Sequence, residues 1–261
     1  MSEPLLQTVA LGKRFGALTV TDDVSLDVMP GEMHALIGPN GAGKTTLIGQ
    51  LTGELRPDTG RIRFRGADIT DLPVDQRARL GLARSFQITS IFDTFTAESN
   101  VALAVQAREP HSFRFWTPAQ SIERLRAPAR RKLHDVGLAG REDTVAADLS
   151  HGEHRQLELA MALATEPQML LLDEPMAGLG MEESHAMADL LRSLKRKFSI
   201  LLVEHDMDIV FSLADRISVL VYGRIVASGT PDEIRVNPDV RTAYLGADAE
   251  DDLEVLADAA R

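Results

Sequence analysis

The nine residues from Gly38 to Thr46 constrain this chain more than any other stretch. They read Gly38-Pro39-Asn40-Gly41-Ala42-Gly43-Lys44-Thr45-Thr46 and fill every fixed position of the pattern G-x-x-x-x-G-K-[ST]. An apolar run of strand type, residues 33–37, precedes them, and residues 47–51 have the character of a helix. Glycines let the backbone form a concave nest of N–H groups, and a following helix adds its positive N-terminal end. The stretch therefore predicts a phosphate-binding loop for a nucleoside triphosphate.

Two side chains of this loop have chemical roles. Lys44 is expected to reach the β- and γ-phosphates, and the Thr45 hydroxyl is expected to ligate Mg²⁺. The alternative is a glycine-rich turn between a strand and a helix. A plain turn has no use for the Lys-Thr pair, so we expect ATP and Mg²⁺ as cofactors.

A second candidate site follows an apolar run at residues 169–172. The run ends in two carboxylates, Asp173 and Glu174. A buried parallel strand has this composition, and its C-terminal end opens at a nucleotide crevice. Asp173 is placed to hold Mg²⁺, directly or through water, and Glu174 to orient and deprotonate an attacking water. The alternative is an acidic pair that starts a surface loop.

The segment 149–153 precedes a helix with an apolar face. Ser150 and Glu153 have the spacing of a capping box. A helix N-terminus with a small loop that includes Gly152 is also an anion site, and both interpretations can hold together.

Three isolated side chains give weaker signals. Gln87 and His205 each follow a strand-like run, where a γ-phosphate sensor would lie, although a lone Gln or His is more often surface or core. Phe15 could stack on a nucleotide base, and an isolated aromatic there is more often core.

Composition excludes several classes of protein. The net charge is −11, from 28 basic and 39 acidic residues, which argues against a nucleic-acid partner. The absence of cysteine excludes disulfides and thiolate metal sites and fits a reducing compartment. No apolar run approaches the roughly 18 residues that span a bilayer, and the N-terminus does not resemble a signal peptide. At a membrane, the chain would act by docking to another subunit.

The order of elements predicts an α/β chain with a helical interruption. The predicted strands include residues 6–11, 24–28, 33–37, 61–64, 83–86, 169–172 and 199–203. Pro30-Gly31 is a hairpin signal between two of them, and Gly223-Arg224 is a second one. Residues 96–164 have a helical pattern in which Pro128 should break or kink a helix. We expect this helical block to be an inserted subdomain.

Taken in order, these motifs resemble the ATP-binding subunit of ABC transporters. The set is Phe15, 38–46, Gln87, 149–153, 170–174 and His205, and the resemblance covers residues 5–246. It implies a P-loop NTPase core of the ABC ATPase type, with an antiparallel β subdomain and an α-helical insert at about 88–165. Residues 1–246 would form this domain, and 247–261 an acidic tail.

The resemblance also implies roles for residues in two copies of the domain. In the family, two such domains close head to tail around two ATP molecules. Phe15 would stack on adenine, while Ser150 and Gly152 would contact the γ-phosphate held by the partner. Closure on ATP and opening after hydrolysis would drive the transporter.

The remaining implied roles are catalytic. Glu174 would be the general base, His205 would hold the γ-phosphate and water in line, and Lys44 would stabilise the charge. Gln87 would link Mg²⁺ and the attacking water to the membrane subunit.

Two motifs depart from the family pattern. His151 and Glu153 replace Gly and Gln in the Leu-Ser-Gly-Gly-Gln signature, and Gly180 replaces an Asp. Glu153 adds negative charge beside an anion site, and Gly180 removes a usual contact to the partner's phosphate loop. An unequal heterodimer is therefore a second possibility for the working assembly.

Shorter stretches resemble one branch of the family, the importers of branched-chain amino acids. They are residues 173–180, 203–207 and 243–246, with 114–116 in an insert typical of the larger ATPase subunit. Urea and lipopolysaccharide transporters share several of them. The branch implies a second ATP-binding subunit, permease subunits and, indirectly, a periplasmic binding protein as partners, with the chain peripheral to the cytoplasmic membrane face.

Two other functional classes fit less well. A soluble ABC ATPase acting on nucleic acid usually has two cassettes or added insertions, unlike this acidic single cassette. A regulatory module without turnover would be expected to lack Glu174 or Lys44, and both are present.

Overall fold

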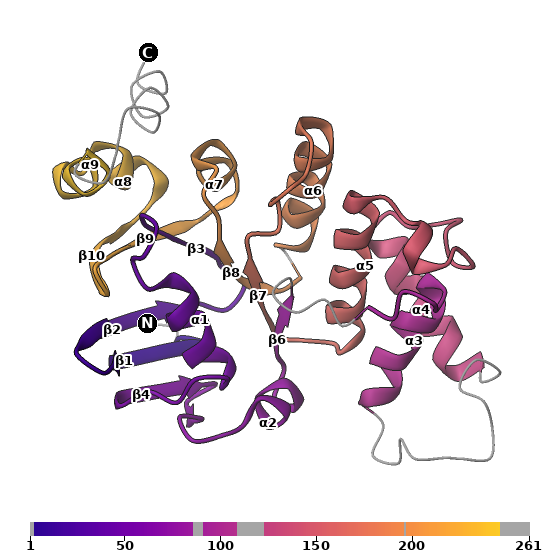
Figure 1. Cartoon of the computed structure of the whole chain (residues 1–261), viewed down its shortest axis with the longest axis horizontal. Coiled ribbons are helices and arrows are strands. Elements are labelled where there is room, and N and C mark those ends of the chain that lie inside the picture. Colours follow the sequence, from indigo (N-terminus) through magenta and orange to yellow (C-terminus); the bar gives the residue numbers. More distant parts are fainter. Residues whose placement is uncertain (1–2, 86–90, 109–122, 196, 246–261) are drawn as a thin grey trace.

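The computed structural model describes residues 3–85, 91–108, 123–195 and 197–245, which form two β-sheets and a group of helices (Figure 1). The first sheet is antiparallel, in the order β2 (Leu18–Val28), β1 (Leu6–Phe15), β4 (Thr59–Phe64), β5 (Ala67–Asp68). The second has the order β10 (Arg224–Gly229), β9 (Arg216–Val221), β3 (Met33–Ile37), β8 (Ser199–Val203), β7 (Met169–Asp173), β6 (Leu82–Ser85). Its strands are parallel except for β10, which pairs with β9 in the antiparallel sense. The expected α/β fold with an antiparallel part is confirmed.

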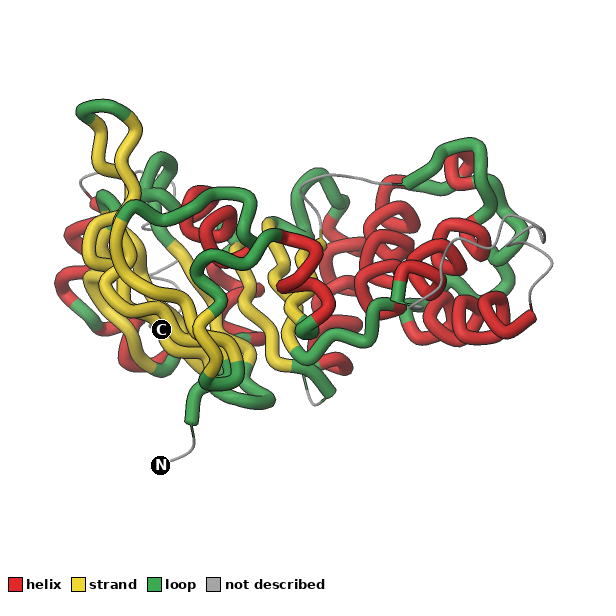
Figure 2. The backbone as a smooth tube through the Cα atoms, turned by 90° about the horizontal axis from the view of Figure 1, so that it is seen from below, coloured by secondary structure: helices red, strands yellow, loops and turns green. Residues whose placement is uncertain are grey.

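Helices cover both faces of the parallel sheet. They are α1 (Lys44–Thr52), α2 (Val74–Arg79), α3 (Ala97–Ala107), α4 (Glu123–Asp135), α5 (His151–Ala164), α6 (Met181–Leu194), α7 (Met207–Leu213), α8 (Pro231–Val236) and α9 (Pro238–Leu245), with a 3₁₀ turn, η2, at Ala146–Asp148. Helices α3, α4 and α5 pack together at the end of the molecule away from the antiparallel sheet (Figures 1 and 2). Among the described residues, no helix has both the length and the apolar character needed to cross a membrane.

Helix α1 lies in the core between the two sheets. Its buried Leu47, Ile48 and Leu51 belong to one apolar cluster with side chains of both sheets. Side chains alternate between the faces of β7, so that Leu171 points to this cluster, while Leu170 and Leu172 join the cluster that includes α5 and α6. A strand buried on both faces is a continuous apolar run, which is why residues 169–172 could be recognised.

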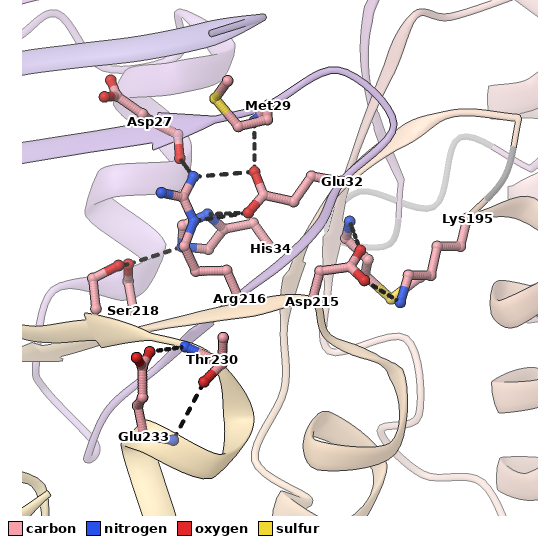
Figure 3. A network of polar contacts seen from close by, with 12 residues as sticks. Asp27, Met29, Glu32, His34, Lys195, Asp215, Arg216, Ser218, Thr230 and Glu233 are labelled. Carbon is pink, nitrogen blue, oxygen red and sulfur yellow. Dashed lines mark hydrogen bonds and ion pairs between the residues drawn. The ribbon is translucent and has the colours of Figure 1, made fainter. Parts of the chain in front are cut away.

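A polar network fixes the start of β3, the strand that leads into the 38–46 loop (Figure 3). Arg216 donates to both carboxylate oxygens of Glu32, at 2.7 and 3.0 Å, and also to the carbonyl of Asp27 at the end of β2. His34 is buried beside it, with its Nε2 2.8 Å from the Ser218 hydroxyl. Burial, assisted by the charge of Arg216, lowers the pKa of His34 to about 3, so the ring is neutral. The network joins the two sheets at the start of β3, the end of the strand that lies away from the loop.

One predicted hairpin is wrong. Pro30-Gly31 does not join two paired strands, because β2 belongs to the antiparallel sheet and β3 to the parallel one. Strand β3 pairs instead with β8 and β9, far along the chain. The chain does turn here, since the Glu32 N–H donates to the Met29 carbonyl at 3.2 Å, but pairing with distant strands decides which neighbours β3 has.

Of the predicted break or kink at Pro128, the break does not occur, since α4 runs continuously through this residue. Proline removes one backbone hydrogen bond, and the buried face of Leu125, Ala129 and Leu133 packs the helix on both sides of it.

The hairpin near residue 223 is confirmed with a shift of one residue. Val221 pairs with Arg224, so Tyr222 and Gly223 form the turn, with φ of 45° and 79°. Two positive φ values are typical of the two-residue turns that suit twisted strands.

Candidate functional site

The loop 38–46 is held between strands of both sheets. A Cβ placed on Gly38 would lie 2.0 Å from the carbonyl oxygen of Leu220 in β9, and one on Gly43 would lie 2.5 Å from that of Val20 in β2. Gly43 also has φ of 105°, which side chains with a Cβ rarely adopt. Only glycine fits these two positions, so the loop backbone is fixed close to both strands.

The loop ends at an open helix N-terminus. Gly43 is the N-cap of α1, and no side chain of the described residues caps it. The next residues, Lys44, Thr45 and Thr46, carry no negative charge. Uncapped N–H groups and the helix dipole together attract an anion. This end of α1 therefore fits a phosphate group.

Of the other loop residues, Pro39 and Ala42 are hydrogen-bonded through their backbone, and Asn40 and Gly41 are exposed. The Ala42 N–H donates to the Pro39 carbonyl at 3.1 Å, and the Ala42 carbonyl accepts from the Gly223 N–H at 2.9 Å.

Lys44 lies folded back into this loop. Its Nζ donates to the carbonyls of Gly38, at 2.6 Å, and Pro39, at 3.1 Å, and the side chain is buried. Burial lowers the pKa of Lys44, and the charges of Glu174 and Asp173 oppose the shift. The ammonium group and the two carboxylates thus share one site, as the sequence predicted.

Asp173 ends β7 and is almost fully buried. It accepts a hydrogen bond from Arg84 Nη2 at 2.9 Å, and Nη1 of the same guanidinium donates to Glu54 at 2.6 Å. Burial raises the pKa of Asp173, and the charge of Arg84 opposes that rise. Carboxylate and hydroxyl oxygens are ligands that Mg²⁺ accepts, and it usually takes only one or two carboxylates besides phosphate oxygens. Asp173 and the hydroxyl of the exposed residue Thr45 are of this donor type, although the described residues contain no group of three acidic, histidine or cysteine side chains placed to hold a metal ion.

Glu174 and His205 form a pair at the ends of two adjacent strands. The Nε2 of His205 lies 2.5 Å from Oε1 of Glu174, and both side chains are more than two-fifths exposed. Glu174 has φ of 52°, a left-handed conformation that costs free energy outside glycine, and its N–H donates to the Val203 carbonyl at 2.8 Å. A carboxylate held by an imidazole at the open end of a sheet is equipped to accept a proton from water.

Glu204 holds the backbone on both sides of this pair. Its buried carboxylate accepts hydrogen bonds from the N–H groups of Met176, at 2.8 Å, and His205, at 3.1 Å. Burial raises its pKa, and the two N–H donors and the charge of His205 oppose the shift. Glu204 thereby connects the loop after Glu174 to the end of β8.

Phe15 lies at the end of the β1–β2 hairpin with half of its surface exposed. The ammonium of Lys13 lies 5.7 Å from its ring centroid. The same hairpin contacts the phosphate loop through Val20 and Gly43. An exposed aromatic at the tip of this hairpin is available for stacking.

Ser150 and Gly152 lie elsewhere, at the N-terminus of α5. Ser150 and Glu153 form the predicted capping box: the Ser150 hydroxyl accepts from the Glu153 N–H at 3.2 Å, and Glu153 accepts from the Ser150 N–H at 2.8 Å. Arg141 binds Glu153 through two hydrogen bonds, 2.6 and 2.9 Å, which lower the pKa of that carboxyl. Strands β6 and β7 stand between α1 and α5 (Figure 1).

This helix end touches the segment that follows Glu174. The His151 Nε2 lies 3.4 Å from the Ala177 carbonyl, and a Cβ on Gly152 would lie 2.7 Å from the Glu183 carboxylate at the start of α6. The structure therefore gathers Lys44, Thr45, Asp173, Glu174 and His205 at one site, with Ser150 and Gly152 at another. Gln87 lies outside the described residues.

Three charged side chains at these sites belong to none of the sequence motifs: Arg84, Glu54 and Arg141. Arg84 is one strand away from Asp173, and only the order of strands reveals that they meet. Arg141 is twelve residues before Glu153, and no spacing rule links them.

Comparison with known proteins places these sites in a family context. The family described as ABC transporter matches residues 21–177, and the family described as branched-chain amino acid ATP-binding cassette transporter matches residues 224–250. The high-affinity branched-chain amino acid transport ATP-binding protein LivG of Escherichia coli K12 is 40% identical over 253 residues, covering 94% of this chain and 99% of LivG. The lipopolysaccharide export system ATP-binding protein LptB of Acidithiobacillus ferridurans is 39% identical over 247 residues, covering 94% and 98%.

The fold agrees with these matches. The ADP conformation of MJ1267, an ATP-binding cassette of an ABC transporter, superposes with a TM-score of 0.83 at 31% identity, covering 94% of this chain and all of that one.

Proposed function

We propose that this chain, which belongs to the ABC transporter ATP-binding family, hydrolyses ATP to power an importer of branched-chain amino acids. The observation that carries the catalytic part is the meeting of Lys44, Asp173 and the Glu174–His205 pair at one end of the parallel sheet. An ammonium, a buried carboxylate and a carboxylate held by imidazole are the groups that phosphoryl transfer to water requires.

The cargo is inferred from similarity. The match over residues 224–250 and the 40% identity to LivG support branched-chain amino acids. The 39% identity to LptB supports a lipopolysaccharide transporter as the second candidate. Urea transport rests on the sequence resemblance alone.

Residues of this chain bind the nucleotide, orient the attacking water and accept its proton. The α1 N-terminus and Lys44 hold the phosphates, Phe15 stacks on the base, and Thr45 and Asp173 would hold Mg²⁺. Bound ATP supplies the γ-phosphoryl group, and Mg²⁺ at this place would supply positive charge for the phosphate oxygens. Glu174 accepts the proton of the attacking water, and His205 fixes the direction of the Glu174 carboxylate.

His205 would also hold the γ-phosphate and water in line, and Gln87 would contact Mg²⁺ and this water. These two assignments follow the family resemblance. The 2.5 Å contact between His205 and Glu174 supports a position for His205 beside the attacking water.

The second half of the site comes from another cassette. Ser150 and Gly152 stand at the N-terminus of α5, and β6 and β7 lie between α5 and α1 (Figure 1), so we assign both residues to the γ-phosphate held by a partner. The partner is a copy of this chain or a second ATP-binding subunit. Gly180, where the family pattern has Asp, caps α6 with its N–H bonded to Glu183 at 3.1 Å, and this change favours an unequal pair.

The assembly follows from the same proposal. Permease subunits are the direct partners, a periplasmic binding protein acts indirectly, and the chain lies peripherally on the cytoplasmic membrane face, with no nucleic-acid partner. Residues 1–246 form the cassette, with a helical insert at about 88–165 that includes α3–α5, and residues 247–261 form an acidic tail.

The test is the Glu174→Gln variant, which keeps size and polarity but cannot accept a proton. We expect ATP binding to persist and steady-state hydrolysis to fall by about 10²- to 10⁴-fold, the usual contribution of a general base. Hydrolysis is measured by phosphate release, with Glu182→Gln, an exposed carboxylate at the start of α6, as the control.

Light scattering of the same variant tests the assembly. A mass that doubles on addition of Mg-ATP supports a homodimer, and a monomer that binds ATP supports an obligate second subunit. Substantial turnover by Glu174→Gln would remove Glu174 as the base.

A further inference from the structure

We propose that Arg84 is a positioning residue for Asp173 and, through it, for the divalent cation that accompanies the nucleotide. The inference rests on the proposed function in one respect, the use of Asp173 as a magnesium ligand. Arg84 belongs to neither the phosphate loop nor the acidic pair, yet it binds the Asp173 carboxylate directly.

Strand pairing brings Arg84 to this place. Strands β6 and β7 are parallel neighbours, and Arg84 pairs with Leu171, two residues before Asp173. Side chains two apart in a strand share a face, and Leu171 faces α1. Leu82, two residues before Arg84, faces the same cluster. Arg84 therefore extends along the α1 face of the sheet to the end of β7.

Glu54 holds the other end of the guanidinium. It follows Gly53, the C-cap of α1, and accepts from Arg84 Nη1 at 2.6 Å, while Nη2 donates to Asp173 Oδ2 at 2.9 Å. The planar guanidinium thus connects the end of the phosphate-binding helix to the end of β7. Because the Arg84 side chain is only 11% exposed and that of Asp173 only 5%, little water competes with the bond between these two residues, while the Glu54 side chain is 39% exposed.

This geometry has two consequences for a cation. Fixing Oδ2 of Asp173 fixes the plane of the carboxylate and so the direction of Oδ1, as hydrogen bonds to metal-binding carboxylates commonly do. Glu54 offsets the positive charge of Arg84, so a divalent cation at Asp173 meets less repulsion than an unpaired arginine would cause. Arg84 keeps the Asp173 carboxylate aimed, and Glu54 makes that arrangement compatible with Mg²⁺.

The experiment separates cation binding from nucleotide binding. The affinity for ADP is measured by calorimetry in EDTA and again with saturating Mg²⁺, and the ratio of the two affinities is the magnesium-dependent gain. For Arg84→Gln we expect an unchanged affinity in EDTA and a gain reduced by about 10- to 100-fold, the usual cost of losing such a supporting group. Arg84→Lys should recover only part of the gain, since an ammonium cannot bridge both carboxylates in the same fork.

Two further variants complete the design. Arg56→Gln removes an exposed arginine that pairs with Asp71 at 2.7 Å, and it should leave both affinities unchanged. Glu54→Gln leaves Arg84 in place with one neutral partner, and we expect a smaller reduction of the gain, which tests the idea even if Arg84→Gln does not fold.

Several outcomes would overturn the inference. A larger gain in Arg84→Gln would make Arg84 a competitor of Mg²⁺, and equal losses in EDTA and in Mg²⁺ would make its role purely structural. An unchanged gain in both Arg84→Gln and Glu54→Gln would exclude any role toward the cation. If wild-type protein bound no ADP under either condition, the proposed function itself would fail.

Discussion

Helices α1 and α5 begin in opposite ways. The first turn of α1 has a glycine N-cap, no side-chain cap among the described residues and no acidic side chain. The first turn of α5 has a complete capping box, and the carboxylate of that box is itself bound by Arg141. One helix leaves its N–H groups to a ligand, and the other satisfies part of them within the chain.

In the proposed assembly, this difference makes the two halves of the phosphate site unequal before a ligand binds. The α1 end offers N–H groups that no side chain of the described residues caps, and Lys44 must exchange the carbonyls of Gly38 and Pro39 for a phosphate. The α5 end already holds a carboxylate, so a phosphate there must approach beside Glu153, whose charge Arg141 offsets. The departure that the sequence flagged as unfavourable is therefore compensated by a residue that no motif contains.

The largest expected effect comes from weakening the open end at α1. Lys44→Ala removes the ammonium group that lies in the loop, and we expect ATP affinity to fall by about 100-fold, the upper part of the range for a hydrogen bond to a charged group. Calorimetry measures the change. Lys195→Ala, which removes a lysine paired with Asp215 at 2.7 Å, is the matched control. Unchanged ATP affinity in Lys44→Ala would contradict the phosphate-loop assignment.

A smaller effect is expected at the capped end. Ser150→Ala removes the N-cap of α5 and should lower the free energy of unfolding by about 1 kcal/mol. Thr230→Ala removes an equivalent cap from α8 and should cost a similar amount. In a Glu174→Gln background only Ser150→Ala should weaken ATP-dependent doubling, by about tenfold, because only this hydroxyl is assigned to a partner's phosphate. Equal doubling in the two variants would leave the α5 end with a capping role alone.

The smallest expected effect concerns the charge of Glu153. Arg141 lowers the pKa of Glu153 in the folded state, so the stabilisation is present above the ordinary value of about 4.5 and is lost as pH falls through the lower folded value. Glu153→Gln preserves the capping box and removes the titration. The difference in free energy of unfolding between wild type and variant should be constant above about pH 5 and should narrow in acid. Chemical denaturation at several pH values measures it, and a difference that widens in acid would contradict the assignment.

Local patterns predicted the parts of this molecule that local interactions determine. The apolar runs of β3, β7 and β8, the phosphate loop and the capping box at Ser150 all follow from neighbours in sequence. The pairing of strands that lie far apart in the sequence does not follow from such local patterns. Pro30-Gly31 has a turn composition, yet the strands beside it enter different sheets, because β3 pairs with β8 and β9 rather than with β2.

The candidate site divides in the same way. Lys44, Asp173 and Glu174 belong to motifs with a defined spacing, so they could be named in advance. Arg84 and Glu54 meet Asp173 only because β6 lies beside β7 and α1 ends nearby, a relation of strand order that the linear sequence does not contain.

The place of β3 between β8 and β9 also determines when this protein can first bind ATP during its synthesis. The phosphate loop begins at residue 38, but the strand that supports it has no neighbours until residues 199–221 have been made. At roughly 5–20 residues per second, a ribosome needs roughly 10–30 s to cover that interval. Throughout it, the nascent chain carries a complete phosphate-binding sequence with no folded site, and its apolar β3 segment must be shielded from other chains.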